Sequence, residues 1–318
     1  MIGGKMIMQA KTQLAEQIED AERKEDILKY DNYAKKILSH KMILAYILQR
    51  VVKELKGMSI PEIVSCFEGD VKVGTEALMS DFIRGENLED WRYGEGRIFY
   101  DLRLSLANIE GHLKLFVDVE AQKNFWPGYS LPTRGIVYGA RMISSQIETE
   151  FPLPDYGELK KVYSIWICFD PPKRVGNAIS VYSMKKEDLL GHIPCEETAY
   201  DKLSVVQICL DDSSPDQGDR MIRLLNTIFS GNYTSKEVEE TLEDEYNIPM
   251  SRAFKEEVGI MCNLGERIAE NATKKGMQKG IQQGIIQSVK KLLENGIPSD
   301  EVKRLLKVTD EEIRLAKK

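Results

Sequence analysis

Two short stretches decide the fold of this chain: RIFYDLRL at residues 97–104 and LKLFVDVE at residues 113–120. In both, apolar and polar side chains alternate, and aromatic and β-branched residues are frequent, which is the pattern of a strand with one buried face. The stretch ANIEG at residues 107–111 separates them and is typical of a turn. We therefore predict an antiparallel hairpin in the middle of the chain.

Helical and strand patterns alternate on both sides of this hairpin. Apolar residues recur at helical spacing from about Tyr30 to Leu55, and Ser59 can cap a short helix that follows. Thr133 can cap a helix over about 134–148, and residues 162–169 are apolar on both faces, as in a central strand. The pattern predicts further strands at 178–182 and 203–210 and helices at about 216–230 and 236–246. This order favours an α/β fold, with a mixed sheet flanked by helices.

The composition excludes several classes of protein. The chain has 318 residues, a net charge of -7, 42% hydrophobic and 30% charged residues, which is typical of a soluble globular protein. Its apolar runs are too short for a membrane span, and five scattered cysteines without a CxxC spacing predict buried, reduced thiols. The three histidines are isolated, which argues against a histidine metal site. We expect a cytoplasmic protein without a membrane partner.

The charge is unevenly divided along the chain. From Asn271 onward, 11 Lys+Arg and 6 Asp+Glu give +5, so the preceding residues carry -12. We therefore expect an N-terminal helical segment (1–30), a main domain (31–270) and a tail (271–318). Because the tail is basic, the acidic total does not exclude DNA as a partner.

The tail begins with a glycine at every fourth residue: Gly276, Gly280 and Gly284. In a helix, these glycines would form a smooth face that suits close packing or formation of a homo-oligomer, whereas the basic helices predicted at 289–295, at 299–306 and from 310 could contact DNA. A flexible tether is the third alternative.

Acidic residues occupy particular positions on the hairpin. Asp101 lies in the first predicted strand, and Asp118, Glu120 and Gln122 share one face of the second because strand residues two apart point the same way. This polar face can be simply half-solvated. It can instead supply the oxygen ligands that Mg²⁺ prefers, with Mn²⁺ as a possible substitute.

Several motifs support the second interpretation by resemblance. They are EGRIFYD (95–101), VEAQ (119–122), PGY (127–129), RMISSQ (141–146), KVYSIWIC (161–168) and MCNL (261–264). From about Tyr30 to its C-terminus, the chain resembles the Rpn-type recombination-promoting nuclease and transposase family of the PD-(D/E)XK superfamily. The resemblance implies a restriction-endonuclease-like core with a helical C-terminal extension, and a Mg²⁺-dependent DNA endonuclease linked to recombination, mobile elements or phage defence.

The resemblance also assigns roles to hairpin residues. Asp101 and Glu120 would bind the metal, and Gln122 would occupy the position of the superfamily's lysine as a third catalytic residue. Tyr100 stands where the superfamily name has proline. Because an amide holds water but brings no charge, an alternative is a catalytically weak or inactive nuclease fold that binds DNA or protein.

Residues after the hairpin are candidates for substrate contact. In the predicted helix, Arg134, Tyr138 and Arg141 share one face, and Gln146 follows on a neighbouring one. They could hold phosphate oxygens or belong to an ordinary solvated face. The loop aromatics Trp126 and Tyr129 could stack on bases or serve in packing.

Overall fold

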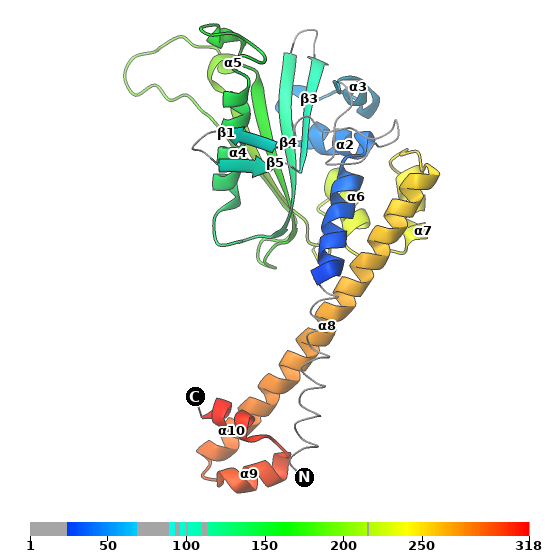
Figure 1. Cartoon of the computed structure of the whole chain (residues 1–318), viewed down its shortest axis with the longest axis vertical. Helices are drawn as coiled ribbons and strands as arrows, with labels where there is room; N and C mark the ends of the chain where they lie inside the picture. Colours follow the sequence, from blue (N-terminus) through cyan, green and yellow to red (C-terminus); the bar gives the residue numbers. More distant parts are fainter. Residues whose placement is uncertain are drawn as a thin grey trace. The chain divides into compact units, whose positions relative to one another are not determined.

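The computed structural model describes residues 24–68, 89–92, 96–99, 101–109, 113–214 and 216–317. Its centre is a five-stranded mixed sheet with helices on both faces, so the predicted α/β class is confirmed (Figure 1). The strand order is β3-β4-β5-β7-β6. The strands are β3 (Leu102–Ile109), β4 (Leu113–Asn124), β5 (Lys161–Asp170), β6 (Ala178–Ser183) and β7 (Leu203–Cys209).

The predicted hairpin is present as the antiparallel pair β3 and β4, in which Leu102 lies opposite Val119. The single strand predicted over 97–104 is wrong, because it divides into β2 (Gly96–Phe99), paired with β1 (Glu89–Arg92), and β3. The division has a physical cause at Asp101, whose backbone N–H donates to the side chain of Glu120 rather than to a strand. Of the stretch predicted as a turn, residues 107–109 belong to β3, and residues 110 and 111 lie outside the described residues, as does Tyr100.

Strand β5 is the central strand that its apolar sequence predicts. It pairs in parallel with β4 on one side and with β7 on the other. Its first eight residues are buried, and exposure increases at Phe169 and Asp170. Two covered faces explain why this strand is apolar throughout rather than alternating.

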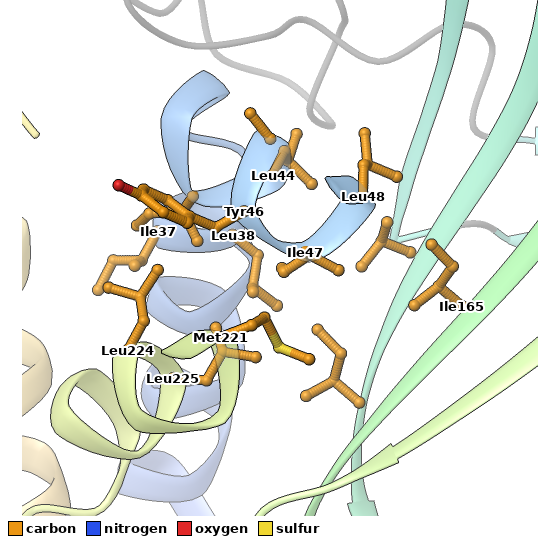
Figure 2. Close-up of a cluster of buried hydrophobic side chains, with 14 of the residues drawn as sticks. Ile37, Leu38, Leu44, Tyr46, Ile47, Leu48, Ile165, Met221, Leu224 and Leu225 are labelled. Carbon is orange, nitrogen blue, oxygen red and sulfur yellow. The ribbon is translucent and has the colours of Figure 1, made fainter. Parts of the chain in front are cut away.

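One face of the sheet packs against helices from both halves of the main domain (Figure 2). These are the helix of residues 24–38, α2 (Lys41–Val51) and α6 (Arg220–Phe229). In Figure 2, Ile47 and Leu48 of α2 lie on the side of the helix toward Ile165 of β5, and Met221 and Leu225 of α6 belong to the same cluster. The residues that form this face are therefore far apart in the sequence, and their burial holds the helices on the sheet.

The continuous helical pattern predicted from about Tyr30 to Leu55 is interrupted. The first helix ends at residue 38, where the Ser39 hydroxyl donates to the carbonyl of Lys36 and His40 adopts an extended backbone. The buried ring of His40 stacks on Phe254, with 4.4 Å between ring centroids. After α2 come η1 (Lys53–Leu55) and α3 (Ile60–Ser65), whose capping box uses Ser59 as predicted.

Helix α4 (Leu131–Ser145) covers the opposite face of the sheet, against β5 and β7. It begins two residues before the predicted cap Thr133, with Ser130 as N-cap, because Pro132 is compatible with the first helical turn. Two glycines allow its close approach to the sheet. A Cβ at Gly139 would lie 2.2 Å from Cδ1 of Leu203, and a Cβ at Gly135 would lie 2.5 Å from Cγ1 of Val205.

The described chain forms two compact units, with the boundary between Gly265 and Glu266. The first unit also contains η2 (Tyr156–Glu158), α5 (Glu197–Tyr200) and α7 (Ser235–Asp244). The proposed boundary after residue 30 falls inside the helix of residues 24–38, and residues 1–23 lie outside the described residues. None of the helices in the described ranges has the length and apolarity that a bilayer crossing needs.

The tail differs in one respect from its sequence pattern. The separate helix predicted at 289–295 is part of α8 (Arg252–Glu294), which also includes the glycine repeat. Helices α9 (Ser299–Leu306) and α10 (Asp310–Ala316) follow as predicted. The second unit has a small core of its own, made of Val289, Val302, Val308, Ile313 and Ala316. A helix continues through the glycines because each costs only about 1 kcal/mol relative to alanine.

All five cysteines are free thiols, and four of them are buried. Cys195 is exposed, contrary to the expectation of buried thiols, because it lies in the irregular segment between β6 and α5.

Candidate active site

Asp101 and Glu120, the predicted metal ligands, lie together, and each side chain accepts a backbone hydrogen bond. Asp101 precedes β3, and Glu120 lies in β4. The backbone N–H of Asp101 donates to Oε1 of Glu120 at 2.9 Å, and the backbone N–H of Ala121 donates to Oδ2 of Asp101 at 3.0 Å. These reciprocal hydrogen bonds fix both carboxylates, one of which is half-buried and the other buried.

A third carboxyl group, that of Asp118, lies on the same face of β4 as Glu120. It is completely buried, and its Oδ2 accepts from the Ser164 hydroxyl at 3.1 Å, while Ser164 in turn accepts from Nε1 of Trp166 at 2.9 Å. Within the described part of the chain, Oδ1 of Asp118 has no hydrogen-bond partner. Burial raises the pKa of Asp118 to about 8.

The three carboxyl groups, here called the carboxylate cluster (Asp101, Asp118 and Glu120), disfavour one another's negative charge. Burial raises the pKa of Glu120 well above its usual value, and the charges of Asp101 and Asp118 raise it further. Burial also raises the pKa of Asp101, although Lys35 acts in the opposite direction. Such a cluster is electrostatically suited to a cation, which would compensate the charge that burial penalises.

Lys35 is a member of this site that no sequence pattern indicates. It lies in the helix of residues 24–38, and its Nζ is 2.9 Å from Oδ1 of Asp101 and 2.8 Å from Oδ2 of Asp31. Burial disfavours the lysine's charge, but the two carboxylates prevail and raise its pKa. No local pattern distinguishes Lys35 from other helical lysines, because its partner Asp101 is distant in the sequence.

The structure also brings Arg134 and Tyr138 of α4 to the side of the cluster. Nη1 of Arg134 donates to the Tyr129 hydroxyl at 3.0 Å, and Nη2 donates to the Tyr138 hydroxyl at 2.6 Å. The guanidinium carbon lies 4.9 Å from the centroid of the Trp166 ring. Trp166 is the register partner of Glu120 on β5, and the charge of Arg134 lowers the pKa of Glu120.

Gln146 and Arg141, the other two residues predicted for substrate contact, are buried in the domain. Gln146 is buried, and its amide bonds the backbone of Lys160, donating to the carbonyl at 3.1 Å and accepting from the N–H at 2.8 Å. It lies about 18 Å along α4 from Arg134, at 1.5 Å per residue. Arg141 lies between them and is also buried. The structure therefore does not bring Gln146 to the carboxylate cluster.

Gln122 and the two loop aromatics, Trp126 and Tyr129, follow Glu120 along the chain. Gln122 is half-buried in β4, two residues beyond Glu120 and on the same face of the strand. The side chain of Trp126 is exposed, and Tyr129 is exposed while its hydroxyl accepts from Arg134. An exposed ring beside Arg134 is compatible with stacking on a base, whereas Trp126 takes no part in a buried core.

The donor atoms of Asp101 and Glu120 are of the type that a hard divalent cation takes. Asp101 and Glu120 offer carboxylate oxygens, and Mg²⁺ is commonly held by one or two carboxylates together with waters and substrate phosphates. In the described ranges, no group of three His, Cys, Asp or Glu side chains is arranged to hold a metal ion. Any ion at this site would therefore take its remaining ligands from outside these side chains.

A second acidic place in the main domain is a cavity at the carboxyl ends of β5 and β7. Two of its carboxylates are hydrogen-bonded: Asp211 accepts from the hydroxyls of Ser213 and Ser214 in its own loop, and Asp212 accepts from Asn232 after α6. Its lining consists of Phe169, Asp170, Pro171, Leu210, Asp211, Asp212, Asn226, Phe229 and Ser230. None of the residues predicted for catalysis or substrate contact is among them.

Comparisons of the chain with protein-family models, with curated proteins and with solved structures give no match.

Proposed function

We propose that this protein is a metal-dependent DNA endonuclease with a restriction-endonuclease-like core, of the recombination-promoting nuclease type. The observation that carries the proposal is the pair of carboxylates, Asp101 and Glu120, that backbone hydrogen bonds hold in place, with the half-buried Gln122 two residues beyond Glu120 in β4. The motifs that resemble the PD-(D/E)XK superfamily include these three residues. The function is drawn from this site, because the α/β architecture alone serves many activities.

Asp101 and Glu120 would hold Mg²⁺, or Mn²⁺ in its place. Such an ion, when bound, lowers the pKa of a coordinated water and stabilises negative charge on a phosphate. The protein's own contribution is to keep the two carboxylates in place through backbone hydrogen bonds before any ligand arrives. A site that is already organised loses little free energy to reorganisation during the reaction.

Gln122 and Arg134 complete the proposed site. The amide of Gln122 can orient the attacking water by donating or accepting a hydrogen bond, although it contributes no positive charge. Arg134 supplies a charge close by, and its guanidinium is held by the hydroxyls of Tyr129 and Tyr138. Arginine carries five N–H donors, so these contacts leave donors for a phosphate oxygen.

The experiment is a plasmid-nicking assay with Mg²⁺ or Mn²⁺ on the parent and on Asp101→Asn and Glu120→Gln variants. Both variants keep the shape of the side chain and remove its charge, so we expect nicking to fall by at least about a hundredfold. Glu197→Gln is the matched control, because Glu197 pairs with Lys53 on the surface. If the first two variants cut as fast as the parent, the assignment is wrong.

A second candidate function is a binding module built on the same fold. It is favoured by Gln122, which is neutral where the superfamily has a lysine, and by Lys35, whose ammonium already contacts Asp101. This candidate predicts DNA or protein binding that is unaffected by divalent metal and survives Asp101→Asn. A gel-shift titration of the parent and this variant, with EDTA and with Mg²⁺, separates the two candidates.

We also propose that the tail mediates self-association. In α8, Met277 and Ile281 are exposed although apolar, with exposed fractions of 65% and 59%. A Cβ at Gly276, Gly280 or Gly284 would meet nothing within 4 Å among the described residues, so the glycine face has room for another helix. Replacing Met277 and Ile281 with glutamate should lower the particle mass in sedimentation, and an unchanged mass would end the idea.

A further inference from the structure

Lys35 is a charged residue of the candidate site to which the proposed nuclease function gives no role. Its ammonium lies between two carboxylates, 2.9 Å from Oδ1 of Asp101 and 2.8 Å from Oδ2 of Asp31. Three-quarters of the Lys35 side chain is shielded from solvent, and the side chain of Asp101 is shielded slightly more. A pair so shielded is screened by salt much less than a surface ion pair.

Both oxygens of Asp101 are therefore engaged. Oδ2 accepts from the backbone N–H of Ala121, and Oδ1 contacts the ammonium of Lys35. The first contact is part of the fold, because it belongs to the clamp between Asp101 and β4. The second contact is made by a flexible side chain that has an alternative partner, Asp31, one helical turn away.

We propose that Lys35 is the resident counter-ion of the carboxylate cluster and that it sets the affinity of the site for a divalent cation. The inference rests on the proposed function, since it takes Asp101 and Glu120 as the ligands of that cation. An ion that approaches Oδ1 of Asp101 competes with the ammonium, which can withdraw toward Asp31. Lys35 is thus a positioning residue that acts through Asp101.

The sign of the effect follows from electrostatics. A positive charge beside a cation site opposes binding of the cation, and in a partly buried site this repulsion is several times stronger than in water. Removing the lysine charge should therefore tighten binding of the metal. A lysine that served the fold alone would, when removed, leave the metal affinity unchanged or weaken it.

The same helix offers a matched control. Lys29 pairs with Glu25 at 2.6 Å in the same four-residue spacing in which Lys35 pairs with Asp31. About half of the Lys29 side chain is exposed. Lys29→Met therefore removes a lysine and an ion pair from the helix without removing the contact to Asp101.

The experiment measures Mn²⁺ binding to the full chain, without DNA, by electron paramagnetic resonance and by calorimetry. For Lys35→Met we expect the dissociation constant to fall by about tenfold or more, the direction that follows from removing like charge. Lys29→Met and the charge-retaining Lys35→Arg should stay within about twofold of the parent, because neither removes the charge next to Asp101. An unchanged or weaker affinity in Lys35→Met overturns the proposal.

A second variant keeps the test decisive if Lys35→Met does not fold. Asp31 is partly exposed and lies on a helix, so Asp31→Asn should fold. It leaves the ammonium with Asp101 as its remaining partner and should weaken Mn²⁺ binding severalfold, whereas unchanged or tighter binding contradicts the proposal.

Failure of the proposed function gives a different result. If the parent and Lys35→Met bind no more Mn²⁺ than Asp101→Asn, the metal site itself is wrong, and the inference about Lys35 falls with it. If the parent binds Mn²⁺ through Asp101 and Lys35→Met binds it equally, the metal site stands and the role of Lys35 alone is refuted.

Discussion

The backbone N–H of Asp101 donates a 2.9 Å hydrogen bond to Oε1 of Glu120. This bond interrupts the strand at Asp101 and joins the two residues on which the proposed chemistry depends. The amide oxygen of a glutamine at position 120 can accept the same bond, whereas the methyl group of an alanine cannot. The contribution of the Glu120 side chain to stability can therefore be measured separately from its contribution to activity.

We therefore expect Glu120→Gln and Glu120→Ala to differ in stability although both lack activity. Glutamine keeps an acceptor for the Asp101 N–H and removes a charge that burial disfavours, so the free energy of unfolding should not fall. Alanine leaves that N–H without its partner and should cost about 1–3 kcal/mol. Urea unfolding followed by circular dichroism measures both, and equal losses would contradict the structural role of the bond.

Helix α4 should be intolerant of side chains at its two sheet-facing glycines. A Cβ at Gly139 would overlap Leu203, so Gly139→Ala should destabilise the main domain by about 1–3 kcal/mol through overpacking. The control is Gly259→Ala in α8, where a Cβ would meet nothing within 4 Å and where alanine should be neutral or stabilising by up to about 1 kcal/mol. Thermal unfolding of both variants tests the packing, and a fully tolerated Gly139→Ala would refute it.

The stability of the main domain should depend on pH through Glu257 of α8. Burial raises its pKa above the ordinary 4.5, and its Oε2 has no hydrogen-bond partner among the described residues. Because the unfolded chain ionises this group at lower pH than the folded one, its contribution is fully present below pH 4.5 and is lost as pH rises through the raised pKa.

Glu257→Gln has no carboxyl group to ionise at this position, so the variant should not lose this part of its stability as pH rises. Its melting temperature should match that of the parent at about pH 4 and exceed it increasingly toward neutral pH. Glu256→Gln is the control, since Glu256 is exposed and pairs with Arg252 at 3.3 Å on the surface. A difference between Glu257→Gln and the parent that is constant with pH would contradict the assignment.

Arg134 should contribute to DNA binding through phosphate contact. Arg134→Gln is expected to weaken binding to duplexes of any sequence and to reduce the slope of log affinity against log salt by about 1. The exposed Arg252, at the start of α8, provides the control variant Arg252→Gln. Fluorescence anisotropy at several salt concentrations measures both slopes, and an unchanged slope for Arg134→Gln would exclude this contact.

Local patterns were sufficient to predict the parts of the fold that depend on neighbouring residues. Alternation predicted the β3–β4 hairpin, and the continuous apolar run predicted the central position of β5. Helix α4 starts before the predicted position, because Ser130 rather than Thr133 is its N-cap and Pro132 is compatible with the first turn. The break at Asp101 could not be predicted, because it results from a tertiary hydrogen bond to Glu120.

In the candidate site, too, local patterns predicted some residues, whereas others depend on tertiary contacts. The hairpin pattern and the resemblance brought Asp101 and Glu120 together, and the strand period indicated that Asp118 lies on the same face of its strand as Glu120. Lys35 could not be found, because it reaches Asp101 from a helix that the sheet positions only after folding. Gln146 was expected at the substrate, yet its amide is used by the backbone of Lys160, a contact between α4 and the start of β5.

The central claim is that Asp101 and Glu120 together bind a divalent cation. The most direct measurement is anomalous scattering from crystals of the full chain soaked in Mn²⁺. We expect a manganese peak in contact with oxygens of both carboxylates, and displacement of the Lys35 ammonium from Oδ1 of Asp101. The claim is contradicted if manganese binds elsewhere and no peak lies at Asp101 and Glu120 although both are open to solvent in the crystal.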